Sequence, residues 1–480
     1  MNDPSRGLAA NVIETHTALV FFVGDRVYKL KKAEDLGFLD HRTREARLRS
    51  CRDEVELNSR LAPDVYLDVL DVSASDGRVL DHLVAMRRMP DERRLSRCVE
   101  RGEDLEPALR SIGHSVETLH ERSSRSEHHD ANARRDAVRA RWTQSFEQVA
   151  AVSGMLEDDS VVRRIQDLVH QYLAGRTELF DQRIDDGRIR DGHGDLQADD
   201  IFVLDDGPRV LDCIEFGADY RWGDVLADVA FLAMDLERLG RPDLGARFLA
   251  LHRELTGDRW PQSLAHHYVA YRALVRAKVT MLRHAQHDEP FGHDVDALLE
   301  LAVRHLEAGQ VRLVLIGGLP GTGKSTLATN VGDALGAVVL RTDEIRRRLA
   351  TTDTDYSPGA VAAVYRKMLL EAEHLLGLGE SVVLDASWSD AAERDLARTV
   401  ALRCQGALGE IECRAPRAEA AARIDRRLRL GEDPSEATTA VATSMAARFA
   451  PWPEADRLST TAAPELVARA ALTTLGVHSR

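Results

Sequence analysis

Two patterns of apolar residues divide the chain. From residue 309 onward, short apolar runs alternate with stretches of helical period; the runs are Leu313–Ile316, Gly336–Arg341, Glu380–Asp385 and Gly409–Cys413. Short runs of Val, Leu and Ile are typical of strands that are buried on both faces. Their alternation with helices predicts a doubly wound parallel sheet, whose ligands bind at the carboxyl ends of the strands.

The earlier residues are patterned differently. Ala18–Val23 and Arg26–Lys31 flank Gly24-Asp25 and predict a hairpin, Arg44–Leu61 predicts a helix, and Leu83–Pro90 predicts an edge strand. Residues 91–180 and 226–283 have mostly helical period. The polar stretch Glu121–Ala137 predicts a loop or flap, and its His128 and His129 are expected to be solvated because they lack metal-ligand spacing.

Composition narrows the class of protein. With 44% apolar residues, 30% charged residues and a net charge of -15, the chain reads as a soluble protein and not as a dedicated nucleic-acid or anionic-membrane binder. Five scattered cysteines without CxxC spacing predict a reduced compartment. No segment has the pattern of a signal peptide or a membrane span, so the expected location is cytoplasmic.

A glycine-rich stretch follows the first buried run of the later region. It reads Gly318-Leu319-Pro320-Gly321-Thr322-Gly323-Lys324-Ser325 and opens at Thr326 into a helical segment. In this strand-to-helix setting the stretch matches a Walker A loop, in which backbone N–H groups wrap a phosphate, Lys324 neutralises its charge and Ser325 can bind Mg²⁺. The sequence therefore predicts a site for ATP and Mg²⁺.

Two acids end the neighbouring strands. Asp343 follows the second run and Asp385 ends the third, so both are expected at the carboxyl edge of the sheet. We expect Asp343 to orient or deprotonate an acceptor hydroxyl and Asp385 to bind Mg²⁺.

An arginine-rich helix at Ala418–Leu430 carries Arg423 and Arg427, and a polar loop at Asp433-Pro434-Ser435 follows it. In a mobile lid these arginines would stabilise the transferred phosphoryl group; the alternative is a solvated basic face.

This region resembles the gluconate-kinase-like and zeta-toxin-like P-loop kinases. The resemblance rests on the Walker A loop, Asp343, the Val382–Ala386 strand with Arg394 downstream, and the Arg423–Arg427 helix. It implies a kinase whose acceptor is a sugar, a sugar acid or a related alcohol.

A second set of candidates lies in the first 290 residues. Only six of the 64 basic residues are lysine, and Lys29 and Lys31 share one face of the predicted hairpin. A strand lysine followed by a helix with an acid, here Glu54, is how kinase-like small lobes hold the phosphate lysine; a solvated helix explains Glu54 equally well. Either lysine could serve.

The stretch Asp191-Gly192-His193-Gly194-Asp195 is followed by Asp200 and Asp212, a turn and two further acids in the spacing of a kinase catalytic loop. It resembles the aminoglycoside phosphotransferase family, which implies that Asp195 is the catalytic base, that Asp200 replaces a metal-binding Asn, and that Asp212 is the second metal ligand. Gln197 departs from the family's second His. Asp224 and Asp228 match a pair that supports the catalytic loop.

Together the two resemblances match bacterial two-domain proteins that join an aminoglycoside phosphotransferase-like half to an AAA-type, kinase-like half. They imply two α/β-type domains: a bilobal protein-kinase-like fold at 1–290, with lobes at about 9–90 and 91–290, and a P-loop NTPase at 309–480, with a linking helix at 291–308 after a linker around Asp288–Gly292.

Three functions remain open. Each half binds MgATP and phosphorylates a small hydroxylated molecule, or the N-terminal half is a pseudokinase that senses a ligand, or the chain is an ATP-driven switch without an acceptor.

Overall fold

The computed structural model describes residues 11–15, 17–35, 39–152, 159–286, 290–349, 357–430 and 438–477. The chain forms two compact units. Unit 1 comprises Met1–Glu157, Gln182–Arg259 and Tyr268–Ala302, and unit 2 comprises Asp158–Asp181, Trp260–His267 and Val303–Arg480. The polar loop expected at Asp433–Ser435 and the first part of the linker, Asp288–Glu289, lie outside the described residues.

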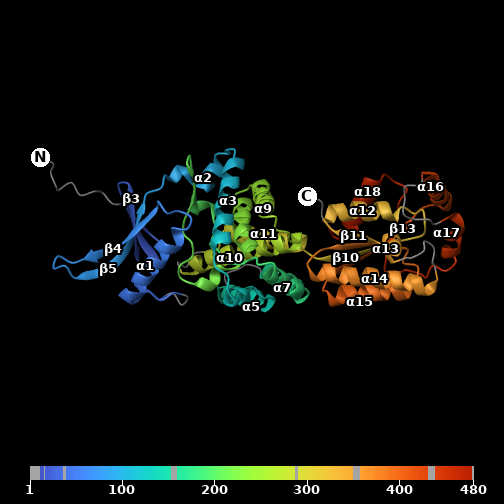
Figure 1. Ribbon diagram of the computed structural model, residues 1–480, viewed down its shortest axis with the longest axis horizontal. Helices are drawn as coiled ribbons and strands as arrows, with labels where there is room; N and C mark the ends of the chain where they lie inside the picture. The colour runs from blue at the N-terminus through green and yellow to red at the C-terminus, as the bar shows by residue number, and fades with distance from the viewer. Residues whose placement is uncertain are drawn as a thin grey trace. The chain divides into compact units, whose positions relative to one another are not determined.

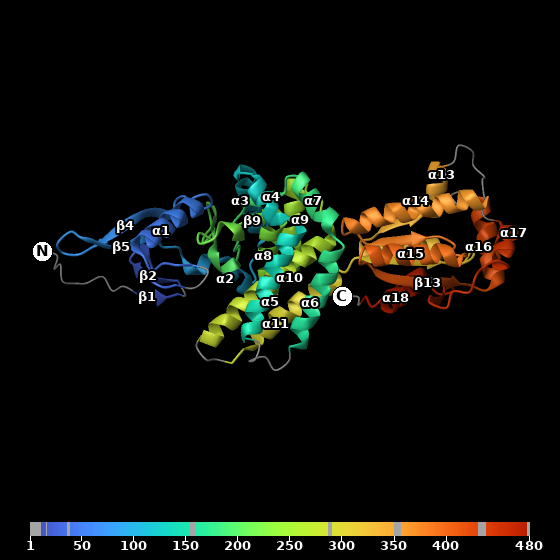
Figure 2. The same cartoon turned by 90° about the horizontal axis from the view of Figure 1, so that it is seen from below.

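Unit 1 begins with a five-stranded antiparallel sheet in the order β1-β2-β3-β5-β4 (Figure 2). The predicted hairpin is confirmed, since β2 and β3 pair from Ala18↔Lys31 to Val23↔Arg26 around a turn at Gly24. β5 pairs with both β3 and β4, so the predicted edge strand is wrong, and the edges are β1 and β4. Helix α1 packs on β4 and β5. The bounds are β1 Asn11–Glu14, β2 Ala18–Val23, β3 Arg26–Lys31, α1 Arg44–Asn58, β4 Tyr66–Ser73 and β5 Val79–Arg87.

The remainder of unit 1 is mostly helical, with two small two-stranded sheets, β6-β9 and β7-β8, in the part of the chain that carries the acids of the catalytic-loop motif. Its elements are η1 Asp91–Arg93, α2 Leu95–Glu100, α3 Glu106–Arg122, α4 Glu127–Ala133, α5 Arg135–Val152, β6 Ile189–Asp191, η3 Ala198–Asp200, β7 Ile201–Leu204, β8 Gly207–Val210, η4 Ala218–Tyr220, β9 Trp222–Asp224, α8 Val225–Arg238 and α9 Pro242–Thr256. Helices α7 Thr177–Asp185, α10 Gln262–Gln286 and α11 His293–Ala308 are shared with unit 2. The linking helix expected at 291–308 is α11, whereas the domain boundaries at 290 and 308 remain predictions.

The flap expected at Glu121–Ala137 is instead largely helical. Ser126 accepts a hydrogen bond from His129 N and so caps α4. The ring of His129 is buried, with its centroid 4.6 Å from that of Trp222. Packing against the tilted ring of Trp222 thus replaces the expected solvation of this histidine.

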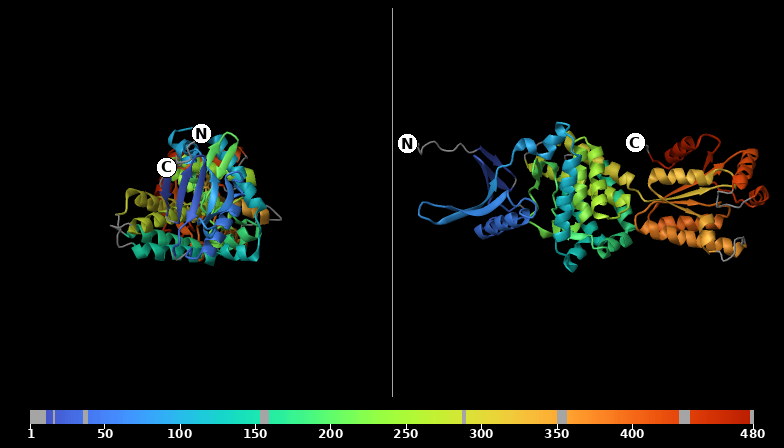
Figure 3. Two further views of the ribbon diagram at one scale, coloured as in Figure 1. Left: turned by 90° about the vertical axis from the view of Figure 1, so that its left-hand side faces the viewer. Right: turned by 45° about the horizontal axis from the view of Figure 1, so that its top comes forward.

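Unit 2 is built on a five-stranded parallel sheet in the order β11-β12-β10-β13-β14 (Figure 1). Helices α12 and α18 cover one face, and α14 and α15 cover the other, which confirms the doubly wound arrangement (Figures 1 and 3). The four expected strands are present, and β14 is an additional edge strand. The bounds are β10 Arg312–Gly317, α12 Lys324–Leu335, β11 Val338–Arg341, α13 Thr342–Leu349, α14 Pro358–Gly377, β12 Val382–Asp385, α15 Ala391–Arg403, β13 Ala407–Arg414, α16 Arg417–Leu430, α17 Thr439–Ala446, β14 Asp456–Ser459 and α18 Pro464–Thr474.

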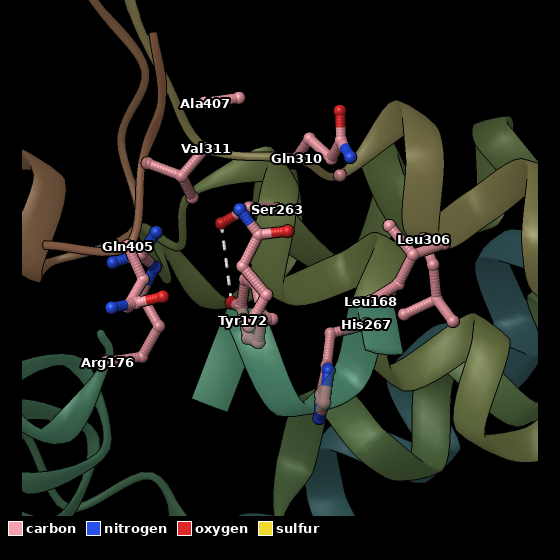
Figure 4. Close-up of a pocket in the computed structure, with 12 residues that line it drawn as sticks. Leu168, Tyr172, Arg176, Ser263, His267, Leu306, Gln310, Val311, Gln405 and Ala407 are labelled. Atoms are coloured by element: carbon pink, nitrogen blue, oxygen red, sulfur yellow. Dashed lines mark hydrogen bonds between the residues drawn. The ribbon is translucent and has the colours of Figure 1, made fainter. Parts of the chain in front are cut away.

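Two segments from earlier in the chain pack at the start of β10 and β13. In α6 (Ser160–Ala174), the hydroxyl of Tyr172 lies 3.3 Å from that of Ser263, which in turn donates to Gly379 O. Figure 4 shows these side chains around a small cavity, with Arg176 and Gln405 beside it. The cavity lies at the amino ends of these strands, so it belongs to the base of the sheet and not to the phosphate loop.

No helix among the described residues is both long enough and apolar enough to cross a membrane.

Candidate functional site

The glycine-rich loop of unit 2 connects β10 to α12, as the sequence predicts. Its three glycines all have positive φ, between 80° and 137°. A Cβ at Gly318 would lie 2.6 Å from Cys413 O, and one at Gly321 would lie 2.4 Å from Ala420 O. Only glycine lets the backbone pass this close to its neighbours in the conformation in which a loop's N–H groups can surround a phosphate. Thr322 fixes the turn by donating from Oγ1 to Leu319 O.

Lys324 and Ser325 form the first turn of α12 beside the end of β12. Asp385 is 5% exposed and accepts a hydrogen bond from Ser325. Burial raises the pKa of Asp385, while the ammonium of Lys324 opposes this rise. The expected pair of Mg²⁺ ligands, Ser325 and Asp385, is therefore in contact at the carboxyl edge of the sheet.

Asp343 lies at the start of α13, directly after β11. Its carboxylate pairs with Arg346, with Nη1 2.8 Å from Oδ1. Arg341, at the end of β11, reaches towards the other acid, with Nε 3.8 Å from Asp385 Oδ2. The two acids thus lie in one cleft, each beside an arginine.

The cleft has a volume of about 640 Å³. Arg423, Arg426 and Arg427 line it, so the predicted lid arginines do face the phosphate loop. Arg423 is held in place by Glu419 and by Thr460, whose carbonyl accepts from Nη2 at 2.8 Å. The residues of the loop that line the cleft are Gly321, Gly323, Lys324, Ser325 and Thr326, whereas Gly318, Leu319, Pro320 and Thr322 do not line it.

Sequence reasoning missed part of this cleft. Arg341, Thr342, Thr460, Ala462, Pro464 and Val467 also line it. Arg341 is the last residue of β11 and Thr342 follows it, so the expectation that ligands bind at the carboxyl ends of the strands could have located both. The segment after β14 could not be located in this way, because β14 was not expected. Arg394 is buried and stacks on Trp452, with its guanidinium carbon 5.2 Å from the ring centroid, which makes it a packing residue.

In unit 1, both candidate lysines contact the candidate helix acid. Glu54 is 1% exposed; its two carboxylate oxygens lie 2.9 Å from Lys29 Nζ and 2.5 Å from Lys31 Nζ. Lys29 also pairs with Asp212 at 2.8 Å, and Lys31 pairs with Glu215. Burial opposes the charge on Lys29, but Asp212 and Glu54 outweigh it and raise the pKa of this lysine well above its usual value. Of the two lysines, Lys29 is the one that contacts the candidate metal acid.

The three acids of the catalytic-loop motif come together. Burial raises the pKa of Asp195 to about 6. Burial, with the charges of Asp212 and Asp195, raises the pKa of Asp200 well above its usual value. Lys29 lowers the pKa of Asp212, which has a positive φ of 64°. The arrangement places one carboxylate near neutral pKa beside two acids that repel each other.

The structural pair of the motif is also in place. Asp228 accepts hydrogen bonds from His193 N at 2.6 Å, from Gly194 N at 2.8 Å and from His120 Nε2 at 3.0 Å. Asp224 caps α8 and forms a bidentate pair with the buried Arg183, which also pairs with Asp258. The contacts of Asp228 fix the backbone of the loop that carries Asp195, and those of Asp224 fix the start of α8.

The donor sets fit Mg²⁺. Within the described ranges, no group of three or more His, Cys, Asp or Glu side chains is arranged to hold a metal by itself. Mg²⁺ bound with ATP takes one or two carboxylates and completes its shell with phosphates and water. Asp385 with Ser325 in unit 2, and Asp200 with Asp212 in unit 1, are such sets, and a cation would relieve the repulsion at Asp200.

Comparisons with known proteins cover both units. A family model described as "AAA domain" matches residues 313–452. Over 461 residues the chain is 42% identical to "Uncharacterized protein Rv2004c" of Mycobacterium tuberculosis and to "Uncharacterized protein Mb2027c" of Mycobacterium bovis, covering 94% of this chain and 92% of each relative.

Two solved structures resemble separate parts of the chain. The Mycobacterium tuberculosis APS kinase CysC, in complex with AMPPNP and APS, is 25% identical with a TM-score of 0.29, over 35% of this chain and 98% of its own. APH(2")-IIia, in complex with GDP and kanamycin, is 15% identical with a TM-score of 0.39, over 62% of this chain and 92% of its own.

Proposed function

This chain belongs to the family of the mycobacterial protein Rv2004c, and we propose that it is an ATP-dependent phosphotransferase acting on small hydroxylated molecules. The observation that carries the proposal is the cleft of unit 2, where Lys324, Ser325, Asp385 and Asp343 meet around a glycine-rich loop. A P-loop with acids at two adjacent strand ends is one arrangement that supports phosphoryl transfer from ATP.

The residues of the cleft have different roles in the proposed transfer. The loop N–H groups and Lys324 hold the β- and γ-phosphates. Asp343 accepts the proton of the acceptor hydroxyl while that oxygen bonds to the γ-phosphorus. The bond from this phosphorus to the bridging oxygen then breaks and ADP leaves. Arg423 and Arg427 offset the charge that builds on the transferred group. Mg²⁺, when bound at Ser325 and Asp385, supplies further charge neutralisation on the phosphate oxygens.

We propose a second ATP site in unit 1. Lys29 would hold the phosphates, Glu54 would orient Lys29, Asp200 and Asp212 would bind Mg²⁺, and Asp195 would be the base. A pKa near 6 suits a base at neutral pH, because most of the carboxylate is then ionised and still takes up a proton readily.

One observation favours the alternative, in which unit 1 is a pseudokinase. Lys29 neutralises Asp212 directly, so a nucleotide with its metal must break this ion pair to bind. A ligand-sensing unit 1 would keep the pair closed.

The experiment is acceptor-dependent ADP release by the full chain, screened with sugar acids, neutral sugars and nucleosides. Lys324→Ala removes a phosphate contact in a loop, and we expect it to lower turnover at the C-terminal site by about 10²-fold or more. Lys367→Ala is the matched control, because Lys367 is half-exposed on α14 and pairs only with Glu371 among the described residues. ATP hydrolysis that no acceptor stimulates would instead identify an ATP-driven switch.

A further inference from the structure

Two arginines of α10 lie at the candidate base of unit 1, in a position that none of the assigned roles uses. Arg272 and Arg276 are one helical turn apart, so they share a face of α10. Arg272 donates from Nη1 to Gly194 O at 2.9 Å, the carbonyl next to Asp195, and from Nε to Ala227 O at 3.1 Å. This face of α10 is therefore fixed against the catalytic loop.

The guanidinium groups of the two arginines differ in their contacts. Arg272 is fully engaged, since its guanidinium also lies over the ring of Phe231, 4.7 Å from the centroid. Arg276 is not: within the described part of the chain, its buried Nε has no hydrogen-bond partner. Arg276 is also the charged side chain that acts most strongly on Asp195.

Asp195 therefore has charges of both signs around it. Asp200 and Asp212 supply negative charge and are the residues proposed to bind the metal. Arg272 and Arg276 supply positive charge from α10, whose face is fixed against the loop at Gly194. An acceptor that presents its hydroxyl to Asp195 comes close to this face of α10, so an anionic group on the acceptor is attracted to the arginines.

We propose that the acceptor of the N-terminal site is an anionic hydroxyl compound, a sugar acid or a sugar phosphate, whose carboxylate or phosphate binds Arg276. A guanidinium pairs with such groups through two parallel hydrogen bonds and repels ammonium groups, so amino sugars are disfavoured. This inference rests on the proposed function of unit 1 and deepens it.

A purely structural role for Arg276 makes a different prediction. If the guanidinium only balanced the charge of Asp195, its removal would shift the pH dependence of kcat and act equally on acceptors of every charge. If it binds the acceptor, its removal raises KM for anionic acceptors and leaves KM for neutral acceptors nearly unchanged, whatever shift it causes in the pH profile of kcat.

The test uses the full chain carrying Lys324→Ala, which lowers turnover in unit 2, and assigns to unit 1 the residual turnover that Asp195→Asn abolishes. ADP release is measured with three classes of acceptor: sugar acids and sugar phosphates, neutral sugars, and amino sugars with aminoglycosides. Glucuronate, glucose and glucosamine form a matched trio that differs mainly in charge. Each acceptor that reacts is measured again with Arg276→Gln and with Arg283→Gln, an exposed control on the same helix.

We expect turnover of an anionic acceptor, with KM raised about 10- to 100-fold by Arg276→Gln, the loss typical of a hydrogen bond to a charged group, and unchanged by Arg283→Gln. Turnover of neutral or amino acceptors that is insensitive to Arg276→Gln would overturn the inference. MgATP binding without turnover of any anionic acceptor would also overturn it, while leaving the nucleotide site of unit 1 intact. Absence of MgATP binding to unit 1 would instead refute the proposed function there, and the inference with it.

Discussion

Lys29 Nζ lies 2.8 Å from Asp212 Oδ1, so the candidate phosphate lysine and the candidate metal acid of unit 1 neutralise each other. Glu54, on helix α1, binds the same ammonium, with its Oε1 2.9 Å from Lys29 Nζ. Opening this ion pair leaves Asp212 free for a metal while Lys29 stays oriented by Glu54. In the proposed nucleotide site, this pair would couple nucleotide binding in unit 1 to the presence of a divalent cation.

Replacing Asp200 tests that coupling. Asp200→Asn removes one of the mutually repelling charges and leaves a neutral oxygen ligand, so activity should persist with a need for about 10-fold more Mg²⁺. The measurement is ATP binding against Mg²⁺ concentration in the Lys324→Ala chain. Asp205→Asn, at a fully exposed side chain, should leave the curve unchanged. A curve for Asp200→Asn that overlays its parent would remove Asp200 from the metal site.

Replacing Asp195 should abolish activity in unit 1 and increase the free energy of unfolding at high pH. Its folded pKa of about 6 lies above the ordinary Asp value of 3.8, so its contribution to stability is full below pH 3.8 and is lost as the pH rises through 6. Asp195→Asn should therefore abolish transfer in unit 1 and yet raise the free energy of unfolding at pH 8 by up to about 3 kcal/mol. Urea unfolding at pH 4 and pH 8 measures this, and the gain should nearly vanish at pH 4. An equal gain at both values would show that ionisation of Asp195 is not the cause.

In unit 2, replacing Asp343 and replacing Asp385 should have different effects. Asp343→Asn should spare ATP binding and abolish transfer, because it removes only the proton acceptor. Asp385→Asn should raise the Mg²⁺ requirement, because this carboxylate contacts Ser325 beside the phosphates. Titration with ATP and acceptor-dependent ADP release measure the two effects. Equal loss of ATP affinity in both variants would contradict this division.

Asp224 should matter for stability. It holds the buried Arg183, which is 3% exposed at its side chain and depends on Asp224 and Asp258 for its charge. Asp224→Ala leaves that guanidinium partly unpaired in the interior and should destabilise unit 1 by about 3–5 kcal/mol. Thermal unfolding of the full chain should then show an earlier transition for unit 1 and no change for unit 2. An unshifted profile would contradict the structural role.

The elements of the fold that could be predicted are those whose burial follows from the apolar residues of their own segment. The four strands expected in unit 2 are apolar runs, and β10 lies buried between two neighbours. β14 was missed because an exposed edge strand, Asp456–Ser459, needs only one apolar residue. The position of β5 inside its sheet depends on pairing with β4, which its own sequence does not encode.

The residues of the two candidate sites could likewise be predicted only where the signal is local in the sequence. Local motifs located the phosphate loop, the strand-end acids and the catalytic-loop acids, because each needs fixed residues at fixed spacing. The choice between Lys29 and Lys31 needed the structure, since both share a strand face and only packing brings Lys29 to Asp212. Arg276 was missed for the same reason, because no motif connects α10 to Asp195.

The central claim is that one chain carries two sites for MgATP, and isothermal titration of the full chain counts them directly. With Mg²⁺ present, the account predicts two ATP molecules bound per wild-type chain. It predicts one per Lys324→Ala chain at concentrations that saturate unit 1 alone, and loss of that remaining binding when Mg²⁺ is removed. A stoichiometry of one for the wild type, or remaining binding that is indifferent to Mg²⁺, would contradict the account and leave unit 1 as a pseudokinase.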